Sequence, residues 1–233
     1  MDHADRHNRP LLAVLIDADN LSSTHAEPIL REITSIGEPA LRRVYGDWSS
    51  PQLEGWSKKL MALGLVAVQA SANTKHKNAT DIGLVIDAMD ILHTDRFDGF
   101  VIVSSDSDFT ALANRLREEG KLVISIGEEK TAPALRNVVN RFILIENLDR
   151  DTPEGAARAR NPKEALGLIK NAMNKIDDTE EWYPLGALGQ ELRAAHPDFD
   201  PRSYGQTKLS QLMQAIPKLE YRAQNNGQVR LKP

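Results

Sequence analysis

The chain has 233 residues, of which 41% are hydrophobic, and this suffices for one large domain or for a medium domain joined to a small one. Its net charge of −4, from 29 Lys and Arg against 33 Asp and Glu, does not by itself indicate a nucleic-acid partner, although basic patches can be local. Because the chain has no cysteine, disulfide scaffolds, thiolate zinc sites and thiol nucleophiles are excluded.

The first residues, MDHADRHNRP, are polar and have no long apolar segment behind them. The longest apolar runs elsewhere are too short to span a bilayer. We therefore expect a cytoplasmic protein with no membrane partner.

Strand and helix patterns alternate along the first part of the chain. Apolar runs predict strands over residues 11–17, 40–48, 65–70, 99–105, 121–127 and 142–147. Helical patterns lie between them, over residues 25–36, 51–63, 80–93, 107–119 and 131–137. Unbroken apolar runs such as FVIV are typical of strands buried on both faces. We predict an α/β domain over residues 10–148, with three layers and a mostly parallel sheet.

The composition changes at residues 149–161, which are mostly charged or small and include one Pro and one Gly, as in a linker. Three further helices are predicted after it, over residues 162–176, 184–195 and 204–215. Two short strands flank Asn225-Asn226-Gly227, a sequence typical of a tight hairpin. Residues 162–233 are therefore expected to form a small winged-helix-like domain.

Acidic residues follow two of the predicted strands. Asp17 ends the first strand, and Asp106 and Asp108 follow the fourth. With a strand order of 3-2-1-4-5, these two strands are neighbours at the point where the order reverses, where functional groups gather. Clustered carboxylates repel one another unless a cation neutralises them, and oxygen ligands without cysteine favour Mg²⁺ or Mn²⁺. Such an ion can hold a phosphate oxygen and activate water.

Asp81, at the start of the predicted helix 80–93, is open to two interpretations. It can be a third acid of the cluster, or a favourable charge in the first turn of a helix that Thr80 caps. Lys75 and Lys77 precede this helix start, where phosphate binding is favoured. Asp87 lies about 240° further round the helix than Asp81, so we expect it to face solvent or to support the site indirectly.

Three other polar residues near the acids have ordinary alternatives. Asp19 is expected to cap the turn into the next helix, and Asn20 is either a turn residue or a group that orients metal-bound water. Asp108 can be a charge at a helix N-terminus. The Asp17-Ala-Asp19 spacing also allows a phosphatase of the haloacid-dehalogenase kind, but the residues that follow it, beginning with Asn20, fit that class poorly.

The segments VLIDADNL, KNATDIGLVIDAM and FVIVSSDSDFTALANRLREEGKLVISIG resemble the NYN domain of the LabA-like group, which is related to PIN-domain nucleases. The resemblance covers roughly residues 10–147. It implies a PIN-like fold and metal-dependent ribonuclease activity on single strands. The catalytic residues that it implies are Asp17, Asn20, Asp81, Asp106 and Asp108. On the resulting hypothesis, Asp17, Asp81 and Asp106 bind the metal ion.

The segments EALGLIKNAM, WYPLGALGQELRAAHPDFDPRSYGQTKLSQLMQAI and VRLKP resemble the OST-HTH, or LOTUS, domain, over about residues 162–232. This implies binding of single-stranded or structured RNA, with docking of a protein partner or of a second copy of the chain as an alternative. The candidate contacts to RNA are Arg202, Gln206, Lys208, Arg222, Arg230 and Lys232.

Together these features predict an endoribonuclease whose C-terminal domain selects the target. An RNA-binding regulator with a slow or inactive site is the alternative.

Overall fold

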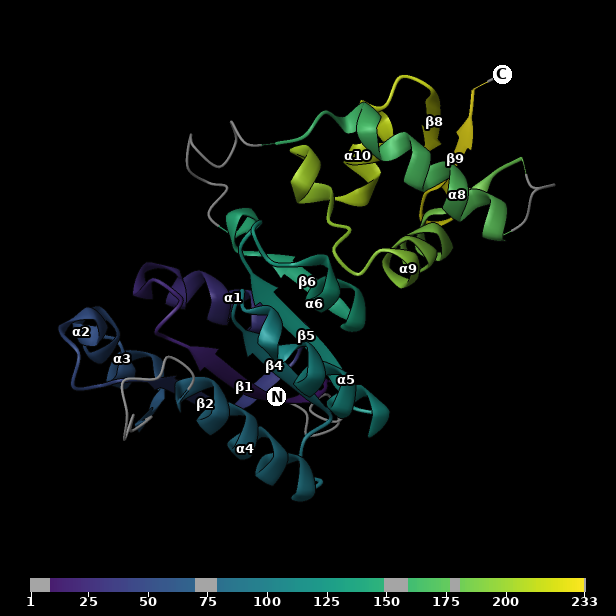
Figure 1. Ribbon diagram of the computed structural model, residues 1–233. Helices are drawn as coiled ribbons and strands as arrows, with labels where there is room; N and C mark the ends of the chain where they lie inside the picture. Colours follow the sequence, from purple (N-terminus) through teal and green to yellow (C-terminus); the bar gives the residue numbers. More distant parts are fainter. Residues whose placement is uncertain (1–8, 70–78, 149–158, 177–180, 233) are drawn as a thin grey trace, which may run out of the picture. The chain divides into compact units, whose positions relative to one another are not determined.

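The computed structural model describes residues 9–69, 79–148, 159–176 and 181–232 (Figure 1). The chain divides into two compact units, Met1–Leu148 and Asp149–Pro233, and each is described by itself. Most of the predicted linker, and both Lys75 and Lys77, lie outside the described residues. None of the helices in the described segments combines the length and the apolar run needed to cross a lipid bilayer.

The first unit is built on a six-stranded sheet in the order β3-β2-β1-β4-β5-β6, and every strand pairs in parallel with its neighbours. The predicted order 3-2-1-4-5 is therefore confirmed, with the sixth strand added at the edge. The strands are β1 (Leu11–Asp17), β2 (Glu38–Gly46), β3 (Val66–Gln69), β4 (Gly99–Val103), β5 (Leu122–Gly127) and β6 (Arg141–Leu144).

Helices cover both faces of this sheet, so the predicted three layers are present (Figure 1). Side chains alternate along each strand, because successive residues point to opposite faces. In β1, Leu12, Val14 and Ile16 pack with α1 (Ala26–Ile36) and α2 (Glu54–Ser57). Ala13 and Leu15 pack with α4 (Ala79–His93), α5 (Thr110–Glu118) and α6 (Pro133–Val138).

Several predicted elements differ from the observed ones in their bounds or continuity. The helix expected over residues 51–63 is broken into a 3-10 turn (Pro51–Leu53), α2 and α3 (Leu60–Leu63). Gly64, which has a φ of 61°, ends α3 in the left-handed conformation. The fourth strand ends at Val103 instead of residue 105, so Ser104 and Ser105 follow it at the carboxyl edge of the sheet.

In its described residues, the second unit packs three helices and a small antiparallel sheet around one core, in a winged-helix-like arrangement. The helices are α8 (Leu166–Ile176), α9 (Leu185–Ala195) and α10 (Leu209–Ala215), and the sheet has the order β7-β9-β8. Its strands are β7 (Tyr183–Pro184), β8 (Leu219–Arg222) and β9 (Gln228–Leu231).

The third helix of this unit starts later than predicted, at Leu209 and not at residue 204. Gly205 has a φ of 75° and ends a 3-10 turn, and Lys208 is extended, so neither position continues a helix. The predicted hairpin is present, but its loop is longer than a tight turn and includes a 3-10 turn over Gln224–Asn226.

Candidate active site

The reversal of strand order brings the carboxyl ends of β1 and β4 together. Ile16 of β1 pairs with Val103 of β4, so Asp17 and Ser104 follow at the same edge. The Asp17 side chain is fully buried. Its Oδ2 accepts hydrogen bonds of 2.9 Å from the Asn20 amide and from the Ser104 hydroxyl. Its Oδ1 is buried without a hydrogen-bond donor among the described residues.

The environment of Asp17 disfavours its charged form. Burial raises the pKa of this carboxyl above its ordinary value, and the hydrogen bonds from Asn20 and Ser104 offset only part of that effect. A buried carboxylate oxygen without a partner costs free energy unless a proton or a cation compensates it. The unpartnered Oδ1 therefore fits a position beside a bound cation.

Ser104, which the sequence did not indicate as a site residue, connects the two acidic segments. Its hydroxyl donates to Asp17 and accepts a 3.1 Å hydrogen bond from the backbone N–H of Asp106. Asp106 in turn accepts a 2.9 Å hydrogen bond from the backbone N–H of Asp108 and so caps the 3-10 turn over Ser107–Phe109. This chain of hydrogen bonds orients Asp106, while Asp108 is exposed. The only signal in the sequence was the position of Ser104, directly between the strand and the acids.

Asp81 lies in the first turn of α4 and joins this cluster. Its pKa is raised to about 6, first by burial and then by the negative charges of Asp17, Asp106, Asp108 and Asp19. The four predicted acids therefore lie close enough to act on one another electrostatically, and Asp19 adds a fifth negative charge.

Asp19 has a different role from the one predicted. Ser22, and not Asp19, caps the following 3-10 turn. The carboxylate of Asp19 accepts a 2.6 Å hydrogen bond from the Thr80 hydroxyl and a 3.3 Å one from the backbone N–H of Asp47. Thr80 lies inside α4, so the prediction that it caps the helix is also wrong. Asp19 instead ties the loop after β1 to α4 and to the end of β2.

Asp87, further along α4, is held by two side chains of β2. It accepts hydrogen bonds from the Arg43 guanidinium and from the Tyr45 hydroxyl. Burial and the neighbouring Asp87 carboxylate raise the pKa of Tyr45. Asp87 therefore fixes α4 against the sheet, which is a supporting role.

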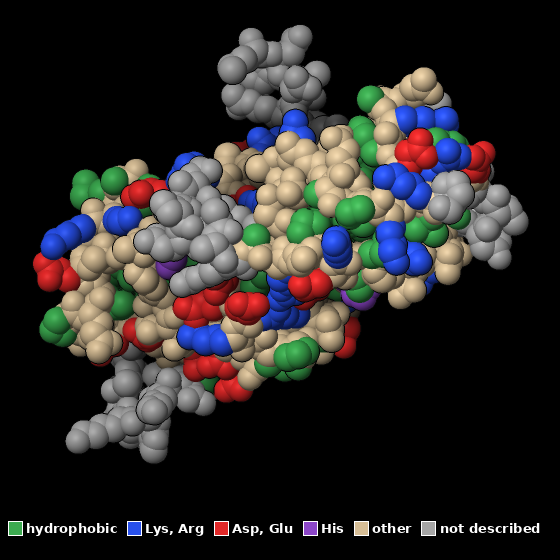
Figure 2. All heavy atoms as spheres, turned by 90° about the horizontal axis from the view of Figure 1, so that it is seen from above, with side chains coloured by type: hydrophobic (Ala, Val, Ile, Leu, Met, Phe, Trp, Pro, Cys, Tyr) green, Lys and Arg blue, Asp and Glu red, His purple; other side chains and the backbone are tan. Residues whose placement is uncertain are grey.

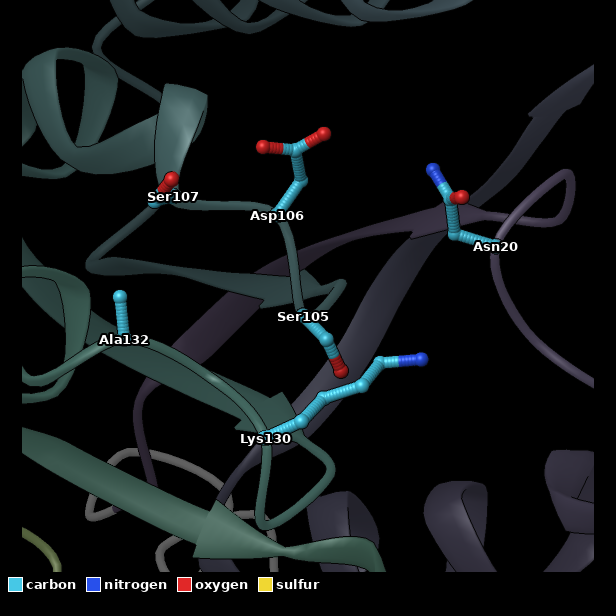
Figure 3. A pocket seen from close by; sticks show the side chains of 6 residues that line it. All are labelled: Asn20, Ser105, Asp106, Ser107, Lys130 and Ala132. Atoms are coloured by element: carbon cyan, nitrogen blue, oxygen red, sulfur yellow. The ribbon is translucent and has the colours of Figure 1, made fainter.

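A cavity of about 370 Å³ opens beside the acids (Figure 3). It is lined by Asn20, Ser105, Asp106, Ser107, Lys130 and Ala132. Lys130, between β5 and α6, was not predicted as a site residue, because a single lysine after two glutamates has the appearance of an ordinary surface charge.

The donor set suits a hard divalent cation such as Mg²⁺ or Mn²⁺, because it consists of carboxylate oxygens and one amide. Within the described residues, however, no three Asp, Glu or His side chains are already arranged to hold one ion together. The residues supply the oxygen ligands that such an ion prefers, and the Oδ1 of Asp17 has no other partner among the described residues. A shared ion would require the other carboxylates to turn toward it.

In the second unit, the residues predicted to contact RNA differ in how far their side chains are already engaged within the protein. The Arg202 guanidinium is paired with Asp200 at 2.7 Å, whereas Lys208 is exposed at the start of α10. Arg222 and Arg230 lie over the ring of Trp182, with guanidinium carbons 3.9 and 4.6 Å from its centroid. On the face drawn in Figure 2, Lys and Arg side chains form scattered groups among acidic ones and no continuous basic patch.

A parallel α/β sheet with acids after β1, after β4 and at the start of α4 defines a nuclease-type domain of the PIN-like class. The chain belongs to the NYN domain family, whose profile matches residues 11–146. Residues 160–231 match the OST-HTH/LOTUS domain. The protein therefore joins a nuclease-type domain to an RNA-binding module, and the phosphatase interpretation of Asp17 and Asp19 is dropped.

A similar fold occurs in the crystal structure of a protein of unknown function from Vibrio parahaemolyticus RIMD 2210633. The two are 20% identical with a TM-score of 0.50, over 59% of this chain and 93% of that chain. At this identity the likeness extends to the fold alone. A search of curated proteins gave no match.

Proposed function

We propose that the protein is a metal-dependent endoribonuclease that cleaves single-stranded RNA. The observation that carries this proposal is the buried Oδ1 of Asp17, which has no donor among the described residues and lies within a cluster of carboxylates. The membership of the NYN family supports a nuclease, and the OST-HTH/LOTUS module supports RNA as the partner.

Asp17, Asp81 and Asp106 would hold Mg²⁺ or Mn²⁺. The ion would neutralise these carboxylates, polarise the phosphodiester and make water a better nucleophile. Water would attack the phosphorus, the bond to the leaving sugar oxygen would break, and that oxygen would take up a proton.

Other residues of the chain position this machinery. Ser104 and Asn20 fix the Asp17 carboxylate by their hydrogen bonds, which orients its free oxygen. We propose that Asn20 also orients water or a phosphate oxygen, since its exposed side chain lines the cavity. Asp108 would assist from its exposed position beside Asp106. Lys75 and Lys77 would steer the RNA backbone toward the acids.

The second unit would hold the target and raise its concentration near the acids through the linker at residues 149–161. Lys208 is exposed and free to approach phosphate, whereas Arg202 would first have to leave Asp200. We therefore assign the larger contribution to Lys208.

The test is cleavage of labelled single-stranded RNA by the purified full chain with Mg²⁺ or Mn²⁺. Asp106→Asn is expected to abolish cleavage, and Asp90→Asn, an exposed acid on α4, is the matched control. Absence of cleavage by the wild type, or equal cleavage by Asp106→Asn, contradicts the proposal.

One observation favours a second function, that of an RNA-binding regulator without turnover. No three acidic or imidazole side chains in the described part of the chain are already arranged around a common ion. Binding of RNA by the wild type without cleavage in either metal would support this alternative.

A further inference from the structure

The cavity beside the acids lies along the carboxyl edge of the sheet, between the segments that follow β1, β4 and β5. Asn20 comes from the first of these, Ser105, Asp106 and Ser107 from the second, and Lys130 from the third. Its volume of about 370 Å³ is within the range of small-molecule and cofactor sites. The cavity therefore extends the site from the carboxylates toward β5.

The lining of this cavity is rich in hydrogen-bond donors. It holds one ammonium group, two serine hydroxyls and one amide, against the single carboxylate of Asp106. Ser105 accepts a 2.9 Å hydrogen bond from the backbone N–H of Glu128, so its own hydroxyl proton can be donated to a ligand. Such a set suits an oxyanion, placed toward Lys130 and away from Asp106.

The segment that carries Lys130 is tied closely to the sheet. A Cβ at Gly127 would lie 2.7 Å from the Thr131 hydroxyl and 2.9 Å from the Ser104 carbonyl oxygen, so only glycine allows this approach. Thr131 is buried, and its backbone N–H donates to the Glu128 carbonyl at 3.0 Å. Lys130 is thus an exposed side chain on an anchored turn, which favours a defined binding role.

The Lys130 side chain has one ionic partner in the described structure, Glu128, at 2.5 Å. The lysine side chain is 71% exposed in this pair, and exposed ion pairs contribute little. In Figure 3 the Lys130 side chain runs past Ser105, and its ammonium group points toward the space between Ser105 and Asn20. An entering phosphate could therefore replace Glu128 as its partner.

We propose that this cavity binds the phosphodiester group next to the one that is cleaved, with the Lys130 ammonium and the Ser105 hydroxyl on its non-bridging oxygens. This subsite rests on the proposed nuclease function, because it assigns the neighbouring carboxylates to the scissile group. Lys130 is a positioning residue in this arrangement: it fixes the strand relative to the acids.

The first test measures how far RNA protects the Lys130 ammonium from acetylation, and it does not require cleavage. The full chain is acetylated with and without a saturating single-stranded uridine decamer in EDTA, and each lysine is quantified by mass spectrometry. Lys58 is the internal control, because its side chain is also 71% exposed and also forms an ion pair, with Glu54 at 2.7 Å. Several-fold protection of Lys130 but not of Lys58 supports the subsite. Equal acetylation of Lys130 with and without RNA overturns it, whether or not the protein cleaves RNA.

The second test is kinetic. Lys130→Ala is expected to raise KM about tenfold, as for loss of one charge-assisted hydrogen bond, with a smaller change in kcat. The slope of log affinity against log salt should fall by about 0.7, as for one lost single-strand phosphate contact. Lys130→Arg should restore most of the affinity, and Lys58→Ala should match the wild type. An unchanged KM and salt slope in Lys130→Ala contradict the subsite while leaving the nuclease proposal intact.

Discussion

The raised pKa of Asp81 leads to a prediction about stability that does not depend on catalysis. In metal-free buffer, Asp81→Asn should stabilise the first unit at neutral pH, because it removes one charge from a cluster of like charges. The folded-state pKa of about 6 lies above the ordinary value of 3.8, so the folded protein binds this proton more tightly than the unfolded chain. The charge therefore destabilises the fold increasingly as the pH rises from 3.8 to 6, and the penalty is constant above pH 6.

The size of the effect follows from the two pKa values. Their difference of about 2 corresponds to about 3 kcal/mol in the free energy of unfolding. Asp81 is only half-buried, and screening by solvent reduces this figure, so we expect a gain of about 1 kcal/mol for Asp81→Asn. The gain should be constant from pH 7.5 to about 6 and should shrink as the pH falls from 6 toward 4.

The assay is calorimetric unfolding in EDTA at several pH values, with Asp90→Asn as the matched control on the same helix. The transition of the second unit serves as an internal reference. With Mn²⁺ present, the order of stability should reverse, because the wild type binds the ion more tightly than Asp81→Asn. A loss of stability for Asp81→Asn at pH 7.5 in EDTA, or a gain that does not depend on pH, would refute the electrostatic argument.

Three further predictions concern single side chains. Ser104→Ala should leave the fold intact and raise the pKa of Asp17 further, because it removes one of the hydrogen bonds that lower this pKa. The acidic limb of the pH–rate profile should then move to higher pH. Gly127→Ala should destabilise the first unit by about 1–3 kcal/mol in denaturant unfolding, because its Cβ would lie within 3 Å of two oxygens. Trp182→Ala should destabilise the second unit by about 1–2 kcal/mol in the same assay, through loss of two cation–π contacts, and an unchanged midpoint would contradict this.

The fold was predictable because its signals are local and repeated. Apolar runs that suit a doubly buried strand mark β1, β4 and β5, and the reversal of strand order explains why residues 17 and 106 lie at the same edge. The interruption of the helix over residues 51–63 was not predictable in this way, since the apolar pattern of that segment continues through the break. The prediction that Asp19 caps the next helical turn was also wrong, because Asp19 accepts a hydrogen bond from Thr80, which is distant in the sequence.

The site was predictable only in part, for a related reason. Acids at strand ends are recognisable by their charge, but Lys130 and Trp182 have no distinctive neighbours in the sequence, and Ser104 is marked only by its position between a strand and the acids. Ser104 and Trp182 acquire their places through contacts with residues far along the chain: Ser104 with Asp17, and Trp182 with two arginines of the hairpin. A contact between residues that are distant in the sequence cannot be inferred from one sequence alone.

The negative charge of the site affects how it could bind RNA, whose phosphates are also negative. The carboxylates around Asp17 create a negative potential, as the raised pKa of Asp81 indicates, and this potential weakens the binding of phosphate when no cation is bound. In the proposed function, the ion and the substrate therefore bind cooperatively, since each reduces the repulsion that the other would meet. Lys130 supplies one positive charge at the edge of this cluster, which is too little to hold a strand alone. On the proposed function we therefore expect the second unit to supply much of the affinity for RNA, so that separating it from the first should raise KM far more than it lowers kcat.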